Sequence, residues 1–165
     1  MTADLVSPHP LARGGSWSGR ASHRGREKLL EQSPEHGSPV SQLWASLVDV
    51  LRAIDGPSSA LLATADGDAV AVHGLARGDV ARIARQSRAA FATRVHGGPD
   101  PDLAVGRVET LELTVGLRHT VIASVPTPDE RHLLTVTAQG VSVQVLEAWT
   151  RRLADDIHLA LSRPA

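Results

Sequence analysis

The chain has 165 residues, of which 42% are hydrophobic, and a formal net charge of -1. This size and composition predict one globular domain and indicate neither a nucleic-acid partner nor a membrane surface. The absence of cysteine excludes disulfides, thiolate nucleophiles and cysteine-ligated zinc. No apolar run reaches the roughly 18 residues of a membrane span, and the first residues lack the apolar core of a secretory signal, so we expect a cytoplasmic protein without a membrane span.

Residues 1–37 are rich in Gly, Ser, Arg, His and Pro and show no apolar period. Such a composition buries too little apolar surface to offset the entropy lost on folding. We therefore predict a disordered tail over 1–37, followed by one domain over 38–163. Because basic and acidic residues nearly balance in the tail, a solvated segment is favoured over a nucleic-acid-binding arm.

The domain is predicted to begin with a helix and a hairpin. Ser38 and Pro39 suit a helix start, since serine caps the first turn and proline is tolerated there. Apolar residues at helical spacing follow, and the helix is expected to end before Gly56. Strands near 59–65 and 68–74 come next, joined by an Asp-Gly pair whose glycine accepts the positive φ of a tight turn.

A second helix and three further strands complete the predicted sheet. Asp79 is expected to cap this helix, whose apolar residues keep the helical period up to Gly97-Gly98. Three strand-like runs follow over 107–115, 119–125 and 132–138, and their short connections predict antiparallel pairing.

From Ser142 the helical period returns. Apolar residues four apart predict the buried face of this last helix: Val145, Trp149, Leu153, Ile157 and Leu161. The element order α-β-β-α-β-β-β-α predicts an α+β fold, a five-stranded antiparallel sheet flanked by three helices, because amphipathic helices bury their apolar stripes against sheet faces.

The sequence contains no pattern typical of catalysis or of cofactor binding. A nucleophile beside a base, a helical metal pair and a glycine-rich phosphate loop with its lysine are all missing, and the single lysine, Lys28, lies in the tail. Among the eight histidines, a hairpin brings His119 and His132 toward each other, but a metal role is disfavoured. We expect no enzymatic activity, no catalytic residues, no cofactor and no metal.

The second predicted helix is locally basic within a slightly acidic domain, a contrast that attracts acidic partner surfaces. Arg82, Arg85 and Arg88 are therefore candidate partner-binding residues, the alternative being a solvated helix face. Trp44 and Trp149 lie on or beside the apolar stripes of the first and last helices and are expected in the core or in an interface.

The segment "GPSSALLATADGDAVAVHG", followed by an alanine-rich helix, resembles the roadblock family of dynein light-chain-like domains. The segments "ETLELTVGLRHTVIASV" and "HLLTVTAQGVSVQVLEAWTRRLADDI" are similar to that family's final three strands and last helix, so the resemblance covers about residues 40–162. It implies a roadblock/profilin-like fold of bacterial type, with the central helix on one sheet face and the terminal helices on the other. It also implies a homodimer, or a heterodimer with another roadblock protein, and a Ras-like small GTPase or its regulator as partner.

We therefore predict a non-enzymatic dimeric regulator or scaffold of a Ras-like small GTPase in signalling. The dimer is expected to form through the second helix and the strand that follows it, which hides an exposed sheet edge. Its candidate interface residues are Phe91, Leu111, Leu113 and Val115. The alternative function is a small-molecule sensor, since folds with one sheet and flanking helices also hold ligands; an unrecognised enzyme is disfavoured by the missing motifs.

Overall fold

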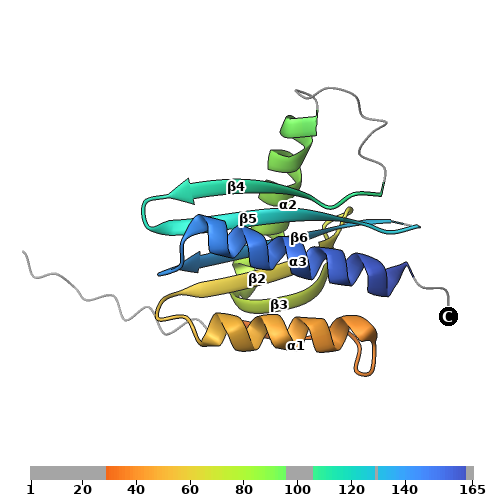
Figure 1. Ribbon diagram of the computed structural model, residues 1–165, viewed down its shortest axis with the longest axis horizontal. Helices are drawn as coiled ribbons and strands as arrows, with labels where there is room; N and C mark the ends of the chain where they lie inside the picture. Colours follow the sequence, from red (N-terminus) through yellow and green to blue (C-terminus); the bar gives the residue numbers. More distant parts are fainter. Residues whose placement is uncertain (1–28, 96–105, 129, 163–165) are drawn as a thin grey trace, which may run out of the picture.

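The computed structural model describes residues 29–95, 106–128 and 130–162. They form six strands and three helices (Figure 1). In chain order the elements are β1 (Leu29–Gln32), α1 (Pro39–Arg52), β2 (Ser58–Thr64), β3 (Ala69–Ala76), α2 (Arg77–Val95), β4 (Glu109–Val115), β5 (Arg118–Pro126), β6 (Arg131–Gln139) and α3 (Val143–Leu161).

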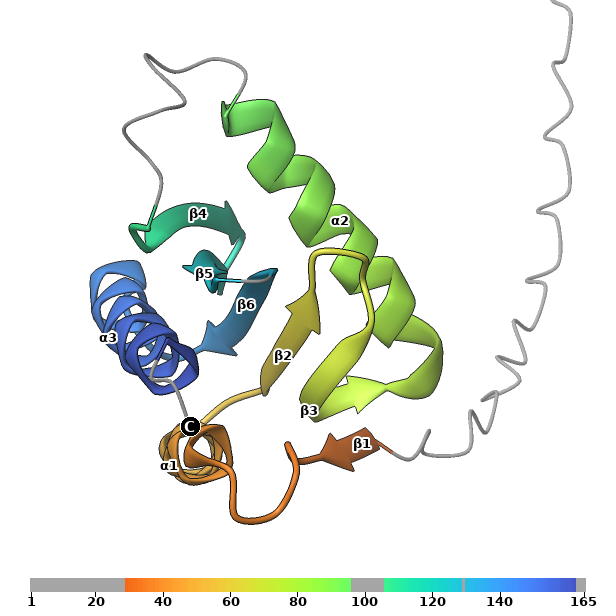
Figure 2. The same ribbon diagram turned by 90° about the vertical axis from the view of Figure 1, so that its right-hand side faces the viewer.

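The strands form one sheet in the order β1-β3-β2-β6-β5-β4, and every neighbouring pair is antiparallel. Figure 2 shows α2 on one face of this sheet and the neighbouring helices α1 and α3 on the other. The predicted α+β class and helix arrangement are thus confirmed. The larger core lies between the sheet and α1 with α3, and two smaller clusters lie beneath α2.

The predicted strand count was wrong by one, because Leu29–Gln32 form a sixth strand, β1, which pairs with β3. These residues belong to the predicted tail. A four-residue run with two leucines gives no periodic signal, and its pairing partner lies about 40 positions away, so only the folded sheet reveals it. Residues 33–37 of the predicted tail connect β1 to α1, and residues 1–28 lie outside the described residues.

Local signals placed most element boundaries correctly. Ser38 caps α1, its Oγ accepting a hydrogen bond from the Ser41 amide at 3.2 Å, and Pro39 stands in the first turn. Gly67 has φ +99 in the β2–β3 turn, as the Asp-Gly signal predicted. Asp79, however, is not a cap: α2 begins at Arg77, and Asp79 lies within its first turn.

The buried face of α3 differs from the predicted one. Its fully buried positions are Leu146, Thr150, Ala154 and Ile157. Val145 and Trp149 are 42% and 40% exposed, although both belong to the predicted stripe. Ile157 is buried as predicted, and the rest of the buried face is displaced by one residue because Thr150 and Ala154, which carry no strong apolar signal, face the core in place of Trp149 and Leu153. By contrast, Trp44 on α1 is buried in the core.

Candidate interaction surface

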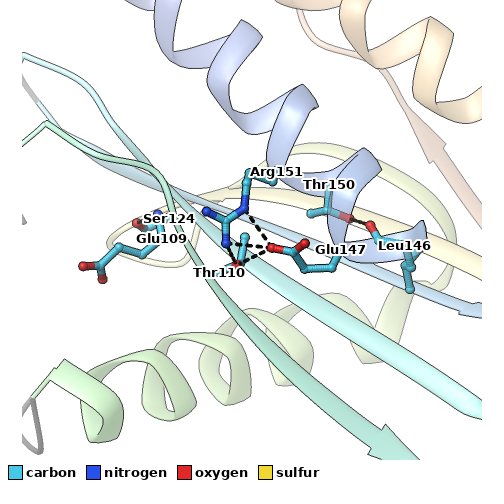
Figure 3. Close-up of polar contacts among 7 residues, drawn as sticks. All are labelled: Glu109, Thr110, Ser124, Leu146, Glu147, Thr150 and Arg151. Atoms are coloured by element: carbon cyan, nitrogen blue, oxygen red, sulfur yellow. Dashed lines mark hydrogen bonds and ion pairs between the residues drawn. The ribbon is translucent and has the colours of Figure 1, made fainter. Parts of the chain in front are cut away.

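Strand β4 lies at an edge of the sheet, and among the described residues no strand covers its outer side. A side-chain network on the α3 face anchors its first half (Figure 3). The Thr110 hydroxyl donates to Glu147 at 2.9 Å and accepts from Arg151 at 2.7 Å, while Arg151 also pairs with Glu147 at 2.7 Å. The hydrogen bonds from Arg151 and Thr110 lower the pKa of the Glu147 carboxyl, because they favour its charged form. The network holds the start of β4 against α3 in one register.

The second half of β4 presents apolar side chains to solvent on the α2 face. Leu111 lies partly buried against the cluster beneath α2, but Leu113 is 42% and Val115 79% exposed. Leu117, in the tight β4–β5 turn next to Gly116, is 74% exposed. Three neighbouring large apolar side chains at one sheet edge exceed the scattered exposure usual on a soluble surface, which makes this edge a candidate interaction surface.

These side chains form one wall of a groove of about 860 Å³ between the β4–β5 turn and the first half of α2. The helix side is lined by Asp79, Arg82, Ile83 and Gln86, and the floor by residues of β5 and β6 that include Ile122 and Thr135. Most floor hydroxyls are satisfied internally: Thr120 bonds Thr137 at 2.9 Å, and Thr135 donates to Ser87 at 2.8 Å. The floor and the β4 wall of the groove therefore offer mainly apolar contact, and the charged side chains lie on its helix side.

The three candidate arginines are all exposed, but α2 gives them different surroundings. Arg82 pairs with Asp79 at 2.6 Å and lines the groove. Arg88 donates to the backbone carbonyls of Ala65 and Asp66, at 3.1 and 3.4 Å, and so ties α2 to the β2–β3 turn. Arg85 lies between them, and in the described part of the chain no hydrogen bond or ion pair involves its side chain. The arginines form a stripe across the helix surface, and Arg85 is the one free for docking.

Of the candidate dimer residues, the structure brings Leu111, Leu113 and Val115 together on one edge and places Phe91 in the buried cluster against which Leu111 packs. Phe91 is only 4% exposed and packs on Ile122 and Leu133 beneath α2. Sequence reasoning missed Leu117, although a large apolar residue beside a turn glycine is a readable signal. It also missed the Glu147–Arg151 pair, whose four-residue spacing is typical of a helical ion pair.

The structure keeps His119 and His132 apart. They pair with Ala138 and Val125, at opposite ends of the β5–β6 ladder, so the expectation that a hairpin brings them together was wrong. A hairpin brings together residues that lie at equal distances from its turn. His132 lies near the β5–β6 turn, whereas His119 lies at the far end of β5. Within the described ranges, no group of three His, Asp or Glu side chains could hold a metal ion, and no helix is long and apolar enough to cross a bilayer.

No protein-family model and no curated protein matches this sequence, but solved structures match its fold. A roadblock/LC7 domain from Streptomyces avermitilis is 20% identical, with 73% of this chain and 95% of that one covered and a TM-score of 0.56. The gliding protein MglB from Thermus thermophilus is 13% identical over 78% of this chain and 95% of its own, with a TM-score of 0.55. MglB from Myxococcus xanthus is 11% identical over 76% and 96%, with a TM-score of 0.51. The chain has the roadblock fold, as its resemblance to that family implied.

Proposed function

We propose that this chain is a cytoplasmic, non-enzymatic dimer that regulates or scaffolds a Ras-like small GTPase in bacterial signalling. The observation that carries the proposal is the uncovered β4 edge, with its exposed apolar side chains beside the α2 groove. The class of partner comes from the roadblock resemblance, which the fold supports. A surface that only binds suits a regulator acting by contact, without a donated catalytic residue.

Dimerisation is proposed to occur by pairing of β4 with β4 of a second copy, or of another roadblock protein, across a two-fold axis. An open edge strand carries unpaired backbone donors and acceptors, which a second edge strand satisfies. A two-fold contact uses the same patch on both chains and therefore closes at two copies. The exposed Leu113, Val115 and Leu117 would be buried in and beside the partner's groove.

Leu113→Asp combined with Val115→Asp tests this dimer. Analytical ultracentrifugation should give about twice the 17.4 kDa chain mass for the wild type. The double variant should need at least about tenfold more protein to dimerise, since each large apolar side chain contributes about 1.5–3 kcal/mol when buried. Leu159→Asp is the matched control, because Leu159 is 56% exposed on α3, which covers the opposite face of the sheet from Leu113 and Val115. Equal loss in the control, or a monomeric wild type at high micromolar concentration, would contradict dimerisation through β4.

The exposed stripe of α2 is proposed to steer an acidic surface of the GTPase. Arg85→Glu reverses the arginine that has no internal role, whereas reversing Arg82 or Arg88 also breaks the contacts to Asp79 or to the β2–β3 turn. The variant should associate more slowly, with an effect that shrinks as salt rises, because surface steering is screened over about 8–10 Å. Association would be measured by surface plasmon resonance against the small GTPase co-purified from the native bacterium.

Arg152→Glu on α3, an exposed arginine on the opposite face of the sheet from α2, provides the matched charge reversal. If both variants slow association equally, net charge rather than the α2 stripe is responsible. If neither does, the GTPase docks elsewhere. GTP hydrolysis by the purified chain alone would contradict the non-enzymatic assignment.

A small-molecule sensor is the second candidate, favoured by the size of the groove, since ligand pockets measure about 300–1,000 Å³. Its floor hydroxyls bond to one another or to Ser87, so the polar groups that remain to orient a ligand lie on the helix side, at Asp79, Arg82 and Gln86. Saturable binding of a metabolite that raises the melting temperature, and that Ile83→Trp abolishes by filling the groove, would favour this function over the first.

A further inference from the structure

The two edges of the sheet differ. Among the described residues no further strand pairs with β4 at one edge, whereas β1 covers β3 at the other (Figure 2). β1 pairs with β3 from Leu29 opposite Ala76 to Gln32 opposite Val72. Beyond the end of β1, the Gln32 side-chain amide donates to the carbonyls of Ala69 and Val70, at 3.3 and 3.4 Å. Backbone and side chain together thus cover β3 from end to end.

Apart from its backbone pairing with β3, this cover is held by few side chains. Leu30 alone among its four residues is partly buried, against the cluster beneath α2. On the opposite sheet face, a Glu31 carboxylate oxygen lies 2.8 Å from His73 Nδ1 and 3.8 Å from the Arg52 guanidinium. The pairing is also interrupted by a register shift between Leu30 and Glu31. A four-residue edge strand with so little burial opens at low free-energy cost compared with the strands at the centre of the sheet.

Without β1, the β3 edge has the properties of a strand-pairing site. Its sequence, AVAVHGLA, contains no Lys, Arg, Asp, Glu or Pro, the residues with which proteins block strand edges. Side chains without a fixed charge line this edge on both sides of the bulge at Gly74 (φ +66), across which β1 already pairs, so an antiparallel copy fits it better than a charged partner. A chain with both β3 and β4 open would also assemble without limit, because two different pairing edges generate open-ended arrays.

We propose that β1 is a displaceable cover of a second strand-pairing edge, and that its displacement lets β3 pair with β3 of a second copy of this chain. The cover confines assembly to the β4 edge. Its release makes a second association available without any change in the sheet itself. This inference goes beyond the proposed function and does not depend on it.

The test uses the full chain with two substitutions in β1. Leu30→Asp places a carboxylate in the partly buried contact between Leu30 and the cluster beneath α2, and Glu31→Lys places a cation beside Arg52. Glu35→Lys is the control for charge, since Glu35 is exposed in the turn before α1. Sedimentation gives the mass, and hydrogen exchange reports β1 and β3 separately. We expect exchange to accelerate in β1, the mass to rise at least twofold over wild type with concentration, and β3 to stay protected. The control should match the wild type.

Three results would overturn the inference: β1 still protected in the double variant, β1 released with an unchanged mass, or the same mass increase in the control. Adding Leu113→Asp and Val115→Asp to the β1 variant separates the two edges. A dimer that survives this addition pairs through β3, even if the wild type proves monomeric and the β4 dimer proposal fails. A wild-type β4 dimer that gains no mass on β1 release keeps the proposed function and refutes this inference.

Discussion

Leucine-to-alanine substitutions at three positions of different burial on α3 test the orientation of this helix. Leu146, Leu153 and Leu159 all lie on α3, but Leu146 is 1% exposed, Leu153 is partly buried and Leu159 is 56% exposed. Leucine and alanine differ little in helix propensity, so changes to alanine compare burial rather than backbone preference. Leu146→Ala removes three buried carbons, about 2.4 kcal/mol at about 0.8 kcal/mol each, and the residual cavity raises the expected loss to about 3–5 kcal/mol.

Leu153→Ala should cost about half as much, and Leu159→Ala less than about 1 kcal/mol, because its atoms already contact water. Urea titration of the three variants measures the free energies of unfolding, provided that their m-values agree. The order Leu146, Leu153, Leu159 follows from the structure. An equal or greater loss at Leu159 would show that α3 is rotated from the orientation described, toward the stripe of Val145 and Trp149.

Two further predictions concern the anchor of β4 and the β2–β3 packing. The hydrogen bonds from Arg151 and Thr110 lower the pKa of Glu147 in the folded chain. They therefore stabilise the fold at pH values above the ordinary carboxyl pKa of about 4.3. This stabilisation is lost as the pH falls through the lower pKa of the folded chain. The gap in unfolding free energy between wild type and Glu147→Gln should thus close below about pH 4 in urea titrations, and a constant gap would refute it. Gly74 has φ +66, and a Cβ there would lie 2.6 Å from the Ser58 carbonyl oxygen, so Gly74→Ala should cost more than the about 1–2 kcal/mol of a left-handed backbone alone. Gly67→Ala, with positive φ but open space, should cost only that amount by thermal denaturation; equal losses would exclude the steric contribution.

Features with a local physical cause could be predicted from the sequence. Ser38 with Pro39 started α1, and the Asp-Gly pair placed the β2–β3 turn, because capping and positive φ act over a few residues. The buried face of α2 was also predicted, since Ala84, Ser87 and Phe91 alternate at three and four residues and stay on one side of the helix. On α3 the predicted face was right at Ile157 and wrong at Val145 and Trp149, because the core-facing Thr150 and Ala154 give no strong apolar signal.

Features that depend on which elements become neighbours could not be predicted. The Glu147–Arg151 spacing is visible on α3, but its bond to Thr110 requires β4 to lie beneath that helix. β1 has no periodicity and is defined by β3 alone. The candidate arginines share a helix, yet their roles differ because the β2–β3 turn approaches Arg88 and not Arg85. In each case the contact depends on how close two segments far apart in the chain come to each other in the folded structure.

The proposed dimer makes one more prediction, about the register of its β4 strands. Glu112 centred on the two-fold axis would face Glu112 of the second copy, and like charges directly opposite destabilise an antiparallel pair. A shift to Leu113 as the centre places Leu113 opposite itself and Glu112 opposite Thr114, so this register is expected. Since the chain contains no cysteine, single substitutions report it cleanly. Leu113→Cys should form a disulfide-linked dimer on mild oxidation, read on a non-reducing gel, whereas Glu112→Cys should not; the reverse result would move the axis to Glu112 and show that the carboxylates tolerate each other.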